Sequence, residues 1–279
     1  MRTFSAFVAV VSLFVTGCAG PDPVKAPKEI DELSAYLFAN FESETGDELV
    51  AGTEELRKFL KDLDLANAEL DDRTFSMSPL QNDDWGGIEG SPEDPAMQLP
   101  LAVAALSDHD LTANIDLAGN KNHVCIDSNT TVYYDREFDS QKKCFLDGDC
   151  DTLRTTNEIR KESVIAKVWY DMYKDYRVIT DEDGKETALI SRSWTDKVWM
   201  GDNGKNSWDQ IYAIDVSIPE GDQTLRYVVF WSAVTIGGVA DDFYVNLVKT
   251  GIEEGYLNSD RFVVGKMCAN PRDREYDRP

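Results

Sequence analysis

The 279-residue sequence predicts a single α+β domain over residues 28–268: N-terminal helices, then an antiparallel β meander, then a C-terminal helix that closes the sheet. Three observations predict this fold. Apolar residues recur at helical spacing near the start of the domain. A period-2 pattern of β-branched and aromatic residues, broken by turn sequences, runs from about 163 to 236. A helical segment with an acidic start follows at 241–256.

Two amphipathic helices open the domain. Their apolar residues are Ile30, Leu33, Leu37 and Phe41 in the first helix, and Leu49, Leu56, Phe59, Leu60 and Leu63 in the second. Gly46 and Asp47 separate the helices, and Asp47 is predicted to be the N-cap of the second. Residues 78–95 are rich in Pro, Gly and Asp, which predicts a loop. The stretch PLAVAALS at 100–107 fits a buried helix turn or a strand, and its periodicity favours neither.

The meander is predicted to hold four strands. The turns between them are DEDGK at 181–185, GDNGKN at 201–206 and PEGDQ at 219–223. The last strand, TLRYVVFWSAVTI at 224–236, is apolar on both faces, which indicates that other layers cover it on both sides. The polar segment 269–279 is predicted to be a tail outside the domain.

The element order, an antiparallel meander that ends in a helix, resembles the helix-grip folds, such as the START-type lipid-binding domains. The resemblance covers about residues 160–262 and rests on element order, since no sequence motif of those domains is present. It implies binding of an apolar ligand, provided that the sheet and the final helix enclose a cavity.

Residues 1–17 have the layout of a secretory signal peptide. Arg2 stands near the start, an apolar run extends from Phe4 to Val15, and no acidic residue is present. The run is too short to span a bilayer, which takes about 20 apolar residues. Val15, Thr16, Gly17 and Cys18 resemble the lipobox of bacterial lipoproteins. This resemblance implies that the Cys18 thiol is diacylated and that the signal peptide is cut before Cys18.

The lipobox resemblance predicts a protein of the bacterial cell envelope that is anchored to the lipid bilayer through acylated Cys18. Several acyl chains on one residue give stable anchoring, because each buried methylene contributes about 0.8 kcal/mol. The residue after the cysteine is Ala19 and not an aspartate, which by resemblance to enterobacterial sorting implies the outer membrane. Residues 18–27 contain three prolines and are predicted to be a stiff tether.

The charge balance is strongly acidic, with 52 Asp and Glu against 28 Lys and Arg and a formal net charge of −24. Such a surface repels phosphate backbones, so a nucleic-acid partner is disfavoured. Solubility accounts for the charge without a specific electrostatic partner.

Four cysteines remain besides Cys18, and an even number in an exported chain favours two disulfides. Three connectivities are possible. We pair the near neighbours, Cys144 with Cys150, and the distant ones, Cys125 with Cys268.

The segment CFLDGDCDTLRTTNE at 144–158 resembles the calcium loop of EF-hands. In that family, oxygen ligands come from loop positions 1, 3, 5, 7, 9 and 12. The resemblance implies a ligand set of Asp147, Asp149, Asp151, the Leu153 carbonyl, Thr155 and Glu158. Thr152 stands where the family has glycine. Two alternatives remain open: a disulfide-clipped acidic turn, or a capping box in which Thr155 and Glu158 begin a short helix. Ca²⁺ is therefore a possible ligand, and no other cofactor is expected.

No catalytic set is predicted. The two histidines, His109 and His123, lie in polar segments, and the sequence patterns of zinc proteases, α/β-hydrolases and phosphate loops are absent from the sequence. The sequence therefore indicates a non-catalytic envelope lipoprotein that binds a partner protein or an apolar ligand. Two alternatives are a calcium-stabilised structural or adhesive module, and an envelope enzyme that uses His109 or His123.

Overall fold

The structure is a computed structural model that describes residues 24–88, 98–163, 167–181, 183–195, 199–200, 206–237 and 240–266. The predicted signal segment 1–17, Cys18 and the tail 269–279 lie outside the described residues. Within the described ranges, no helix is both long and apolar enough to span a membrane.

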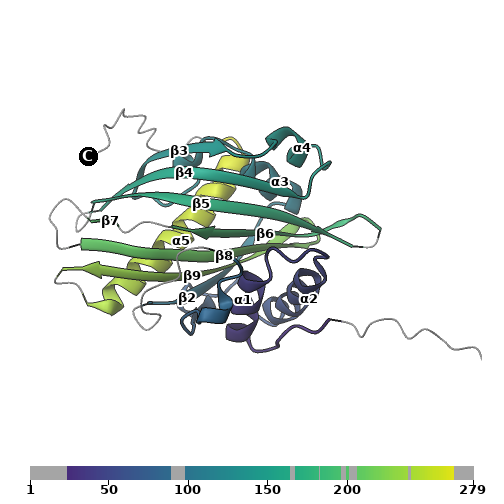
Figure 1. The fold of residues 1–279 in the computed structure, drawn as a ribbon, viewed down its shortest axis with the longest axis horizontal. Helices are drawn as coiled ribbons and strands as arrows, with labels where there is room; N and C mark the ends of the chain where they lie inside the picture. The colour runs from purple at the N-terminus through teal and green to yellow at the C-terminus, as the bar shows by residue number, and fades with distance from the viewer. Residues whose placement is uncertain are drawn as a thin grey trace, which may run out of the picture.

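One antiparallel sheet forms the centre of the fold (Figure 1). Its strands are β1 (Thr74–Ser76), β2 (Leu101–Ser107), β3 (Thr131–Phe138), β4 (Thr152–Glu162), β5 (Lys167–Thr180), β6 (Glu186–Trp194), β7 (Trp199–Met200), β8 (Asn206–Glu220) and β9 (Gln223–Ile236). The strand order is β1-β2-β9-β8-β6-β5-β4-β3, and the two-residue β7 pairs with β8. The strands from β3 to β9 thus form a continuous meander, and β2 and β1 extend it beyond β9.

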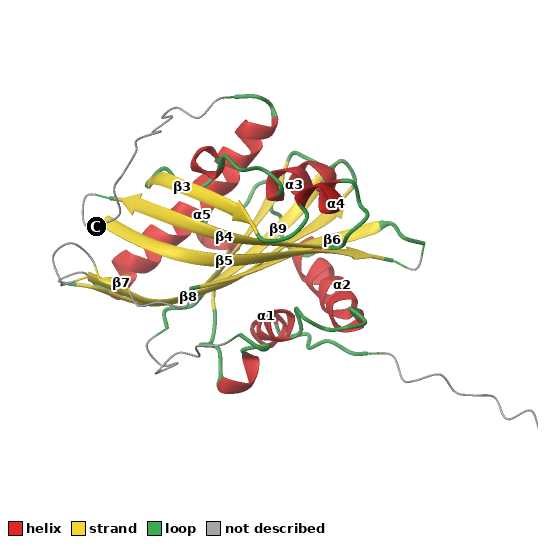
Figure 2. Cartoon of the chain, turned by 45° about the horizontal axis from the view of Figure 1, so that its top comes forward, coloured by secondary structure: helices red, strands yellow, loops and turns green. Residues whose placement is uncertain are grey.

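Helices lie on both faces of this sheet (Figure 2). They are α1 (Ile30–Ala39), α2 (Asp47–Lys61), α3 (Leu111–Ala118), α4 (Lys142–Leu146) and α5 (Asp241–Val263), with short 3-10 turns at Asp71–Arg73, Asn82–Asp84 and His123–Cys125. Helices α1 and α2 cover one face, and α5 crosses the other face diagonally (Figure 1). The predicted α+β fold, with helices before the sheet and a closing helix after it, is confirmed.

The predicted meander corresponds to β5, β6, β8 and β9. Two of its turns contain Gly184 and Gly221 with φ of 77° and 64°, the left-handed region that favours glycine. Residues 101–107 form β2, which decides between the two readings of that stretch in favour of a strand. Strands β3 and β4 extend the sheet before the predicted meander, and the sequence pattern did not predict them.

Helix α2 has a different N-cap from the one that the sequence predicts. Its N-cap is Gly46, which has a φ of 75° and donates its N–H to Ser43 Oγ at 3.2 Å. Asp47 is the first helical residue instead, so its prediction as N-cap is wrong. Its carboxylate still stands at the positive end of the helix dipole, where a negative charge is favourable.

The largest core lies between the sheet and the two N-terminal helices. Alternate residues of β6, β8 and β9 face it, including Ile190, Tyr212, Ile214 and Trp231, and α1 contributes Phe38. The Phe38 ring meets the rings of Tyr212 and Trp231 edge-on, at centroid distances of 6.1 and 5.5 Å. On the other side of β9, Val228 packs with Tyr256 of α5, so β9 is covered on both sides, as its sequence predicted.

Candidate functional site

A cavity of about 390 Å³ lies between the sheet and α5. Strands β3, β4, β5, β6, β8 and β9 line it from the sheet, and α3, α5 and the segment at 123–130 contribute further lining residues. Ile159, Tyr170 and Ile211 form a buried apolar cluster on the sheet side, and Met172 and Phe230 pack against it. Part of the cavity floor is therefore apolar, as a site for an apolar molecule requires, and polar side chains such as Ser191 and Ser217 lie beside it.

Helix α5 meets the cavity with two glycines one turn apart, Gly251 and Gly255. A Cβ atom at Gly251 would lie 3.6 Å from Ser128 Cβ, and one at Gly255 would lie 3.8 Å from the Ile126 carbonyl oxygen. Both are ordinary contacts, so no clash requires glycine at either position. A glycine inside a helix costs about 1 kcal/mol relative to alanine. The two glycines keep side chains out of the cavity at that cost.

One group of polar side chains in the cavity lacks hydrogen-bond partners. The unpartnered atoms among the described residues include Asp215 Oδ1 on β8, Arg226 Nε and Nη1 on β9, and the Tyr256 hydroxyl on α5. Arg226 stacks over the Tyr256 ring at 4.1 Å, and its Nη1 lies 4.0 Å from Asp260 Oδ1. Burial, and next the Asp215 charge, raise the pKa of Tyr256 well above its usual value, so the phenol stays neutral.

A second polar group surrounds Arg136, whose side chain is only 1% exposed. Its Nε donates to Asn157 Oδ1 at 2.8 Å, and its Nη1 donates to the Ala118 carbonyl at 2.9 Å and to His123 Nε2 at 2.5 Å. Since an arginine nitrogen can only donate, His123 Nε2 is the acceptor and carries no proton. Burial, with the Arg136 and Lys174 charges after it, lowers the pKa of His123 well below its usual value. His123 is therefore a neutral acceptor at the cavity wall.

The two predicted histidines lie in different surroundings. His123 lines the cavity, whereas His109 is not among the lining residues. His109 Nε2 lies 3.0 Å from the carbonyl oxygen of Asp260, on the C-terminal half of α5. No shared acid–base site joins the two histidines in the described part of the chain. An envelope enzyme that uses either of them stays a prediction.

The predicted EF-hand geometry is wrong. Strand β4 begins at Thr152, so Thr152 and Glu158 lie about 20 Å apart along an extended strand that rises about 3.3 Å per residue. The residues of the proposed ligand set have separate partners and surroundings. Asp147 pairs with Lys143, Asp151 lies 3.6 Å from Arg177 Nε, and Glu158 accepts a hydrogen bond from Trp169 Nε1. Leu153 and Thr155 are buried, whereas Asp149 is exposed in the turn. In the described ranges no group of three or more His, Cys, Asp or Glu is placed to hold a metal. The capping-box alternative is wrong for the same reason, because Thr155 and Glu158 are in a strand.

Of the three interpretations of residues 144–158, the structure contains the disulfide-clipped turn. Cys144 and Cys150 are joined, with their Cα atoms 5.3 Å apart, as predicted. Gly148 makes the turn between them with a φ of 77°. Cys125 lies in the 3-10 turn at His123–Cys125, but its predicted partner Cys268 lies outside the described residues, so that pairing stays a prediction.

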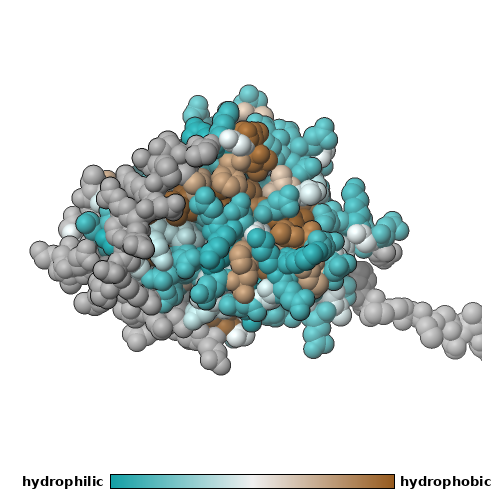
Figure 3. Space-filling view, turned by 90° about the horizontal axis from the view of Figure 1, so that it is seen from above, coloured by the Kyte–Doolittle hydropathy of each residue, from teal (hydrophilic) through white to brown (hydrophobic). Residues whose placement is uncertain are grey.

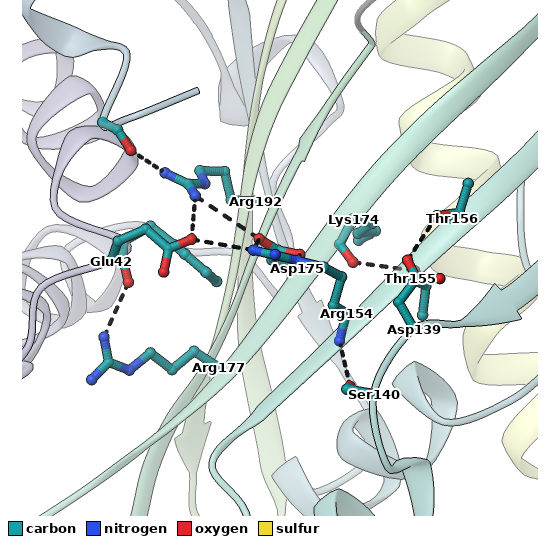
Figure 4. Close-up of polar contacts among 12 residues, drawn as sticks. Glu42, Asp139, Ser140, Arg154, Thr155, Thr156, Lys174, Asp175, Arg177 and Arg192 are labelled. Carbon is teal, nitrogen blue, oxygen red and sulfur yellow. Dashed lines mark hydrogen bonds and ion pairs between the residues drawn. The ribbon is translucent and has the colours of Figure 1, made fainter. Parts of the chain in front are cut away.

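A charged network lies on the opposite face of the sheet, away from the cavity (Figure 4). Arg154, Asp175 and Arg192 are direct neighbours across β4, β5 and β6. Arg154 binds both carboxylate oxygens of Asp175 at 2.7 Å, and Arg192 Nη2 donates to Glu42 Oε1 at 2.7 Å. Arg177 donates to the carbonyl oxygens of residues 41 and 43. The charges of this network are paired, and it attaches the segment after α1 to the sheet.

The face seen from above Figure 1 is mostly hydrophilic, with small groups of hydrophobic residues between the polar ones (Figure 3). Exposed large apolar residues of the described chain include Leu146 on α4 and Leu257 on α5. Single exposed apolar residues are normal on a soluble surface. The cavity is therefore a stronger candidate site than this face.

Comparisons with known proteins give no family. No protein-family model matches the chain, and no curated protein matches it. Solved structures do match. They include a protein of Thermus thermophilus (14% identity, TM-score 0.41, 59% of this chain and 96% of that chain), a STAR-related lipid transfer protein of Xanthomonas axonopodis (11%, 0.42, 64% and 90%) and the Zhui aromatase/cyclase of a Streptomyces species (6%, 0.36, 61% and 93%).

Proposed function

We propose that this protein is an envelope lipoprotein that binds an apolar small molecule between the sheet and α5. The observation that carries the proposal is the cavity of about 390 Å³, which falls within the range of about 300–1,000 Å³ typical of small-molecule sites. The apolar part of its floor can cover the apolar part of a ligand, and polar groups of the lining can orient the ligand. Gly251 and Gly255 support the proposal, because helix stability alone favours a larger residue at both positions.

Filling the cavity should weaken ligand binding. In Gly251→Leu the new side chain enters the cavity, and we expect the affinity for the neutral fluorescent probe N-phenyl-1-naphthylamine to fall by about tenfold or more, since a displaced apolar contact is worth about 1.5–3 kcal/mol. Fluorescence titration of the purified protein measures the change. The fold should survive, because leucine is a better helix former than glycine.

Asn246→Leu is the matched control for this variant. It adds the same side chain to the same helix, but Asn246 is exposed and does not line the cavity. The probe affinity should stay that of the parent protein. If Gly251→Leu also binds the probe as the parent does, the cavity is not the binding site.

The lipid anchor is the second part of the proposal. Only the Cys18 thiol, at the end of the lipobox-like sequence, can accept the diacylglyceryl group. Cys18→Ser should therefore move the protein from the membrane fraction to the soluble fraction and abolish incorporation of labelled palmitate, because acyl chains supply the anchoring free energy.

The control for the anchor is the pair Cys144→Ser and Cys150→Ser. It removes two thiols and a disulfide but keeps Cys18, so the protein should stay in the membrane fraction. A Cys18→Ser protein that still sediments with membranes would refute the lipid anchor.

We propose the outer membrane as the location, because the residue after Cys18 is Ala19 and not an aspartate.

A further inference from the structure

Arg136 is a buried cation without a counter-ion. No carboxylate of the described residues forms an ion pair with it, and the groups that act on its charge are the tyrosines Tyr134 and Tyr176, although the chain has 52 Asp and Glu. Its acceptors on Nε and Nη1 are a side-chain amide, main-chain carbonyls and the neutral His123. A buried charge is costly unless an opposite charge accompanies it. The positive charge of Arg136 is therefore not balanced by a negative charge among the described residues around it.

Two tyrosine hydroxyls connect Arg136 to the cavity. Its Nη2 donates to the Tyr134 hydroxyl at 3.3 Å and to the Tyr176 hydroxyl at 2.9 Å, and both rings line the cavity. Each hydroxyl oxygen is thus an acceptor from arginine, which leaves its own proton to donate elsewhere. Burial raises the pKa of Tyr134, so it stays a phenol and does not supply the missing negative charge. The two hydroxyls share one nitrogen of Arg136, so they lie close together as a pair of donors.

Lys174 adds a second positive charge at the same place. It lines the cavity from β5, with its Nζ 5.2 Å from the centroid of the Tyr176 ring, and it forms no ion pair with a carboxylate of the described residues. Each acidic side chain of the lining has a partner or lies farther away. Asp127, whose charge reaches Tyr134 and adds to the rise in its pKa, pairs with Lys161 at 3.1 Å. Glu254 accepts from the Asn129 N–H, and Asp215 lies on β8, beyond β6. This part of the cavity is consequently positive and rich in donors.

We propose that the cavity binds an amphipathic carboxylate of the fatty-acid type, with the carboxylate held by the Tyr134 and Tyr176 hydroxyls and by Lys174. The inference rests on the proposed binding function of the cavity. The carboxylate accepts the two phenolic protons, pairs with the ammonium and compensates the Arg136 charge through the hydroxyls, which Arg136 polarises. The hydrocarbon chain lies against Ile159 and Met172, which are close to one another on the paired strands β4 and β5. A neutral head group would leave both positive charges uncompensated.

The test compares two probes that differ only in the head group, decanoate and 1-decanol. Calorimetric titrations use the mature chain, residues 18–279 with Cys18→Ser, which keeps every residue that the structure describes. The parent should bind decanoate about tenfold more tightly than decanol, because hydrogen bonds to a charged acceptor are stronger than those to a neutral one. In Lys174→Met the decanoate affinity should fall by about tenfold, with the decanol affinity unchanged.

Lys167→Met is the matched control, because Lys167 is exposed on the same strand and does not line the cavity. It should bind both probes as the parent does. Tyr134→Phe with Tyr176→Phe keeps both rings, removes both hydroxyls and should weaken decanoate selectively as well. Equal binding of the two probes by the parent, unchanged in Lys174→Met, would overturn the anion site and leave the cavity function standing. Binding of neither probe would overturn the cavity function, and the anion site with it.

Discussion

Trp231→Ala should lower the free energy of unfolding by about 3–5 kcal/mol, the usual cost of truncating a large buried aromatic side chain. Trp231 is 1% exposed and packs between β9 and α1, with its ring centroid 5.5 Å from that of Phe38. Its Nε1 also donates to the Ser78 carbonyl oxygen at 3.0 Å. The substitution removes both interactions and leaves a cavity that the sheet cannot close, because β9 is held between β2 and β8.

Chemical denaturation of the purified domain measures the change. Trp231→Phe should cost less, since the edge contact with Phe38 remains and only the hydrogen bond and part of the volume are lost. Phe243→Ala is the matched control. Phe243 is 49% exposed at the start of α5, so its removal should change the free energy of unfolding by no more than about 0.5 kcal/mol. Equal losses in Trp231→Ala and Phe243→Ala would contradict the core described between the sheet and α1.

The sequence predicts those helices and strands that bury apolar residues on one face or on both faces, because the burial leaves a regular hydrophobic pattern. Helices α1 and α2 bury one stripe against the sheet, and β9 buries both of its faces, so their periods are visible. Strand β4 has no such pattern. Its inward residues include Thr155 and Asn157, which are buried as polar groups, and several of its outward residues are charged. Period-2 hydrophobicity is therefore missing, and the regular acidic spacing before β4 resembles a calcium loop instead.

Of the candidate site, the sequence predicts only the sheet and the helix that enclose the cavity. A closing helix over a meander implies a space between them, and Gly251 and Gly255 lie inside a helical pattern at that space. Arg136 could not be found in this way. In the sequence Arg136 is the middle one of three consecutive charged residues in YYDREF, and such a run indicates a solvated segment. Only the pairing of β3 with β4 and β4 with β5 brings its side chain beside Asn157 and Tyr176, and pairing partners are not encoded in local sequence.

The second large effect is expected at the charged network beneath α1. Asp175→Asn should lower the free energy of unfolding by about 1.5–3 kcal/mol, because it removes the charge-assisted hydrogen bonds with Arg154 and one of the two carboxylates beside the buried Arg192. Asp175 is 4% exposed and lies between Arg154 and Arg192, directly opposite both in the sheet. Without its charge, the two guanidinium groups share only Glu42, which is 56% exposed at its side chain and thus more weakly coupled.

A double-substitution cycle distinguishes this loss from a general packing effect. Arg192→Met removes the buried cation but keeps a long apolar side chain beside the Phe41 ring, over which the guanidinium now lies at 4.7 Å. In Asp175→Asn/Arg192→Met both charges are absent, so the double variant should be more stable than the sum of the two single losses implies, by about 1–3 kcal/mol.

The control for this cycle is Lys58→Met, which removes an exposed pair with Glu55 and should leave the free energy of unfolding nearly unchanged, because water and salt screen such a pair. Strictly additive losses in the cycle would show that Asp175 and Arg192, 3.9 Å apart at their nearest charged atoms, do not stabilise one another. The coupling that we expect would instead show that Asp175 is needed because the second arginine is buried beside it.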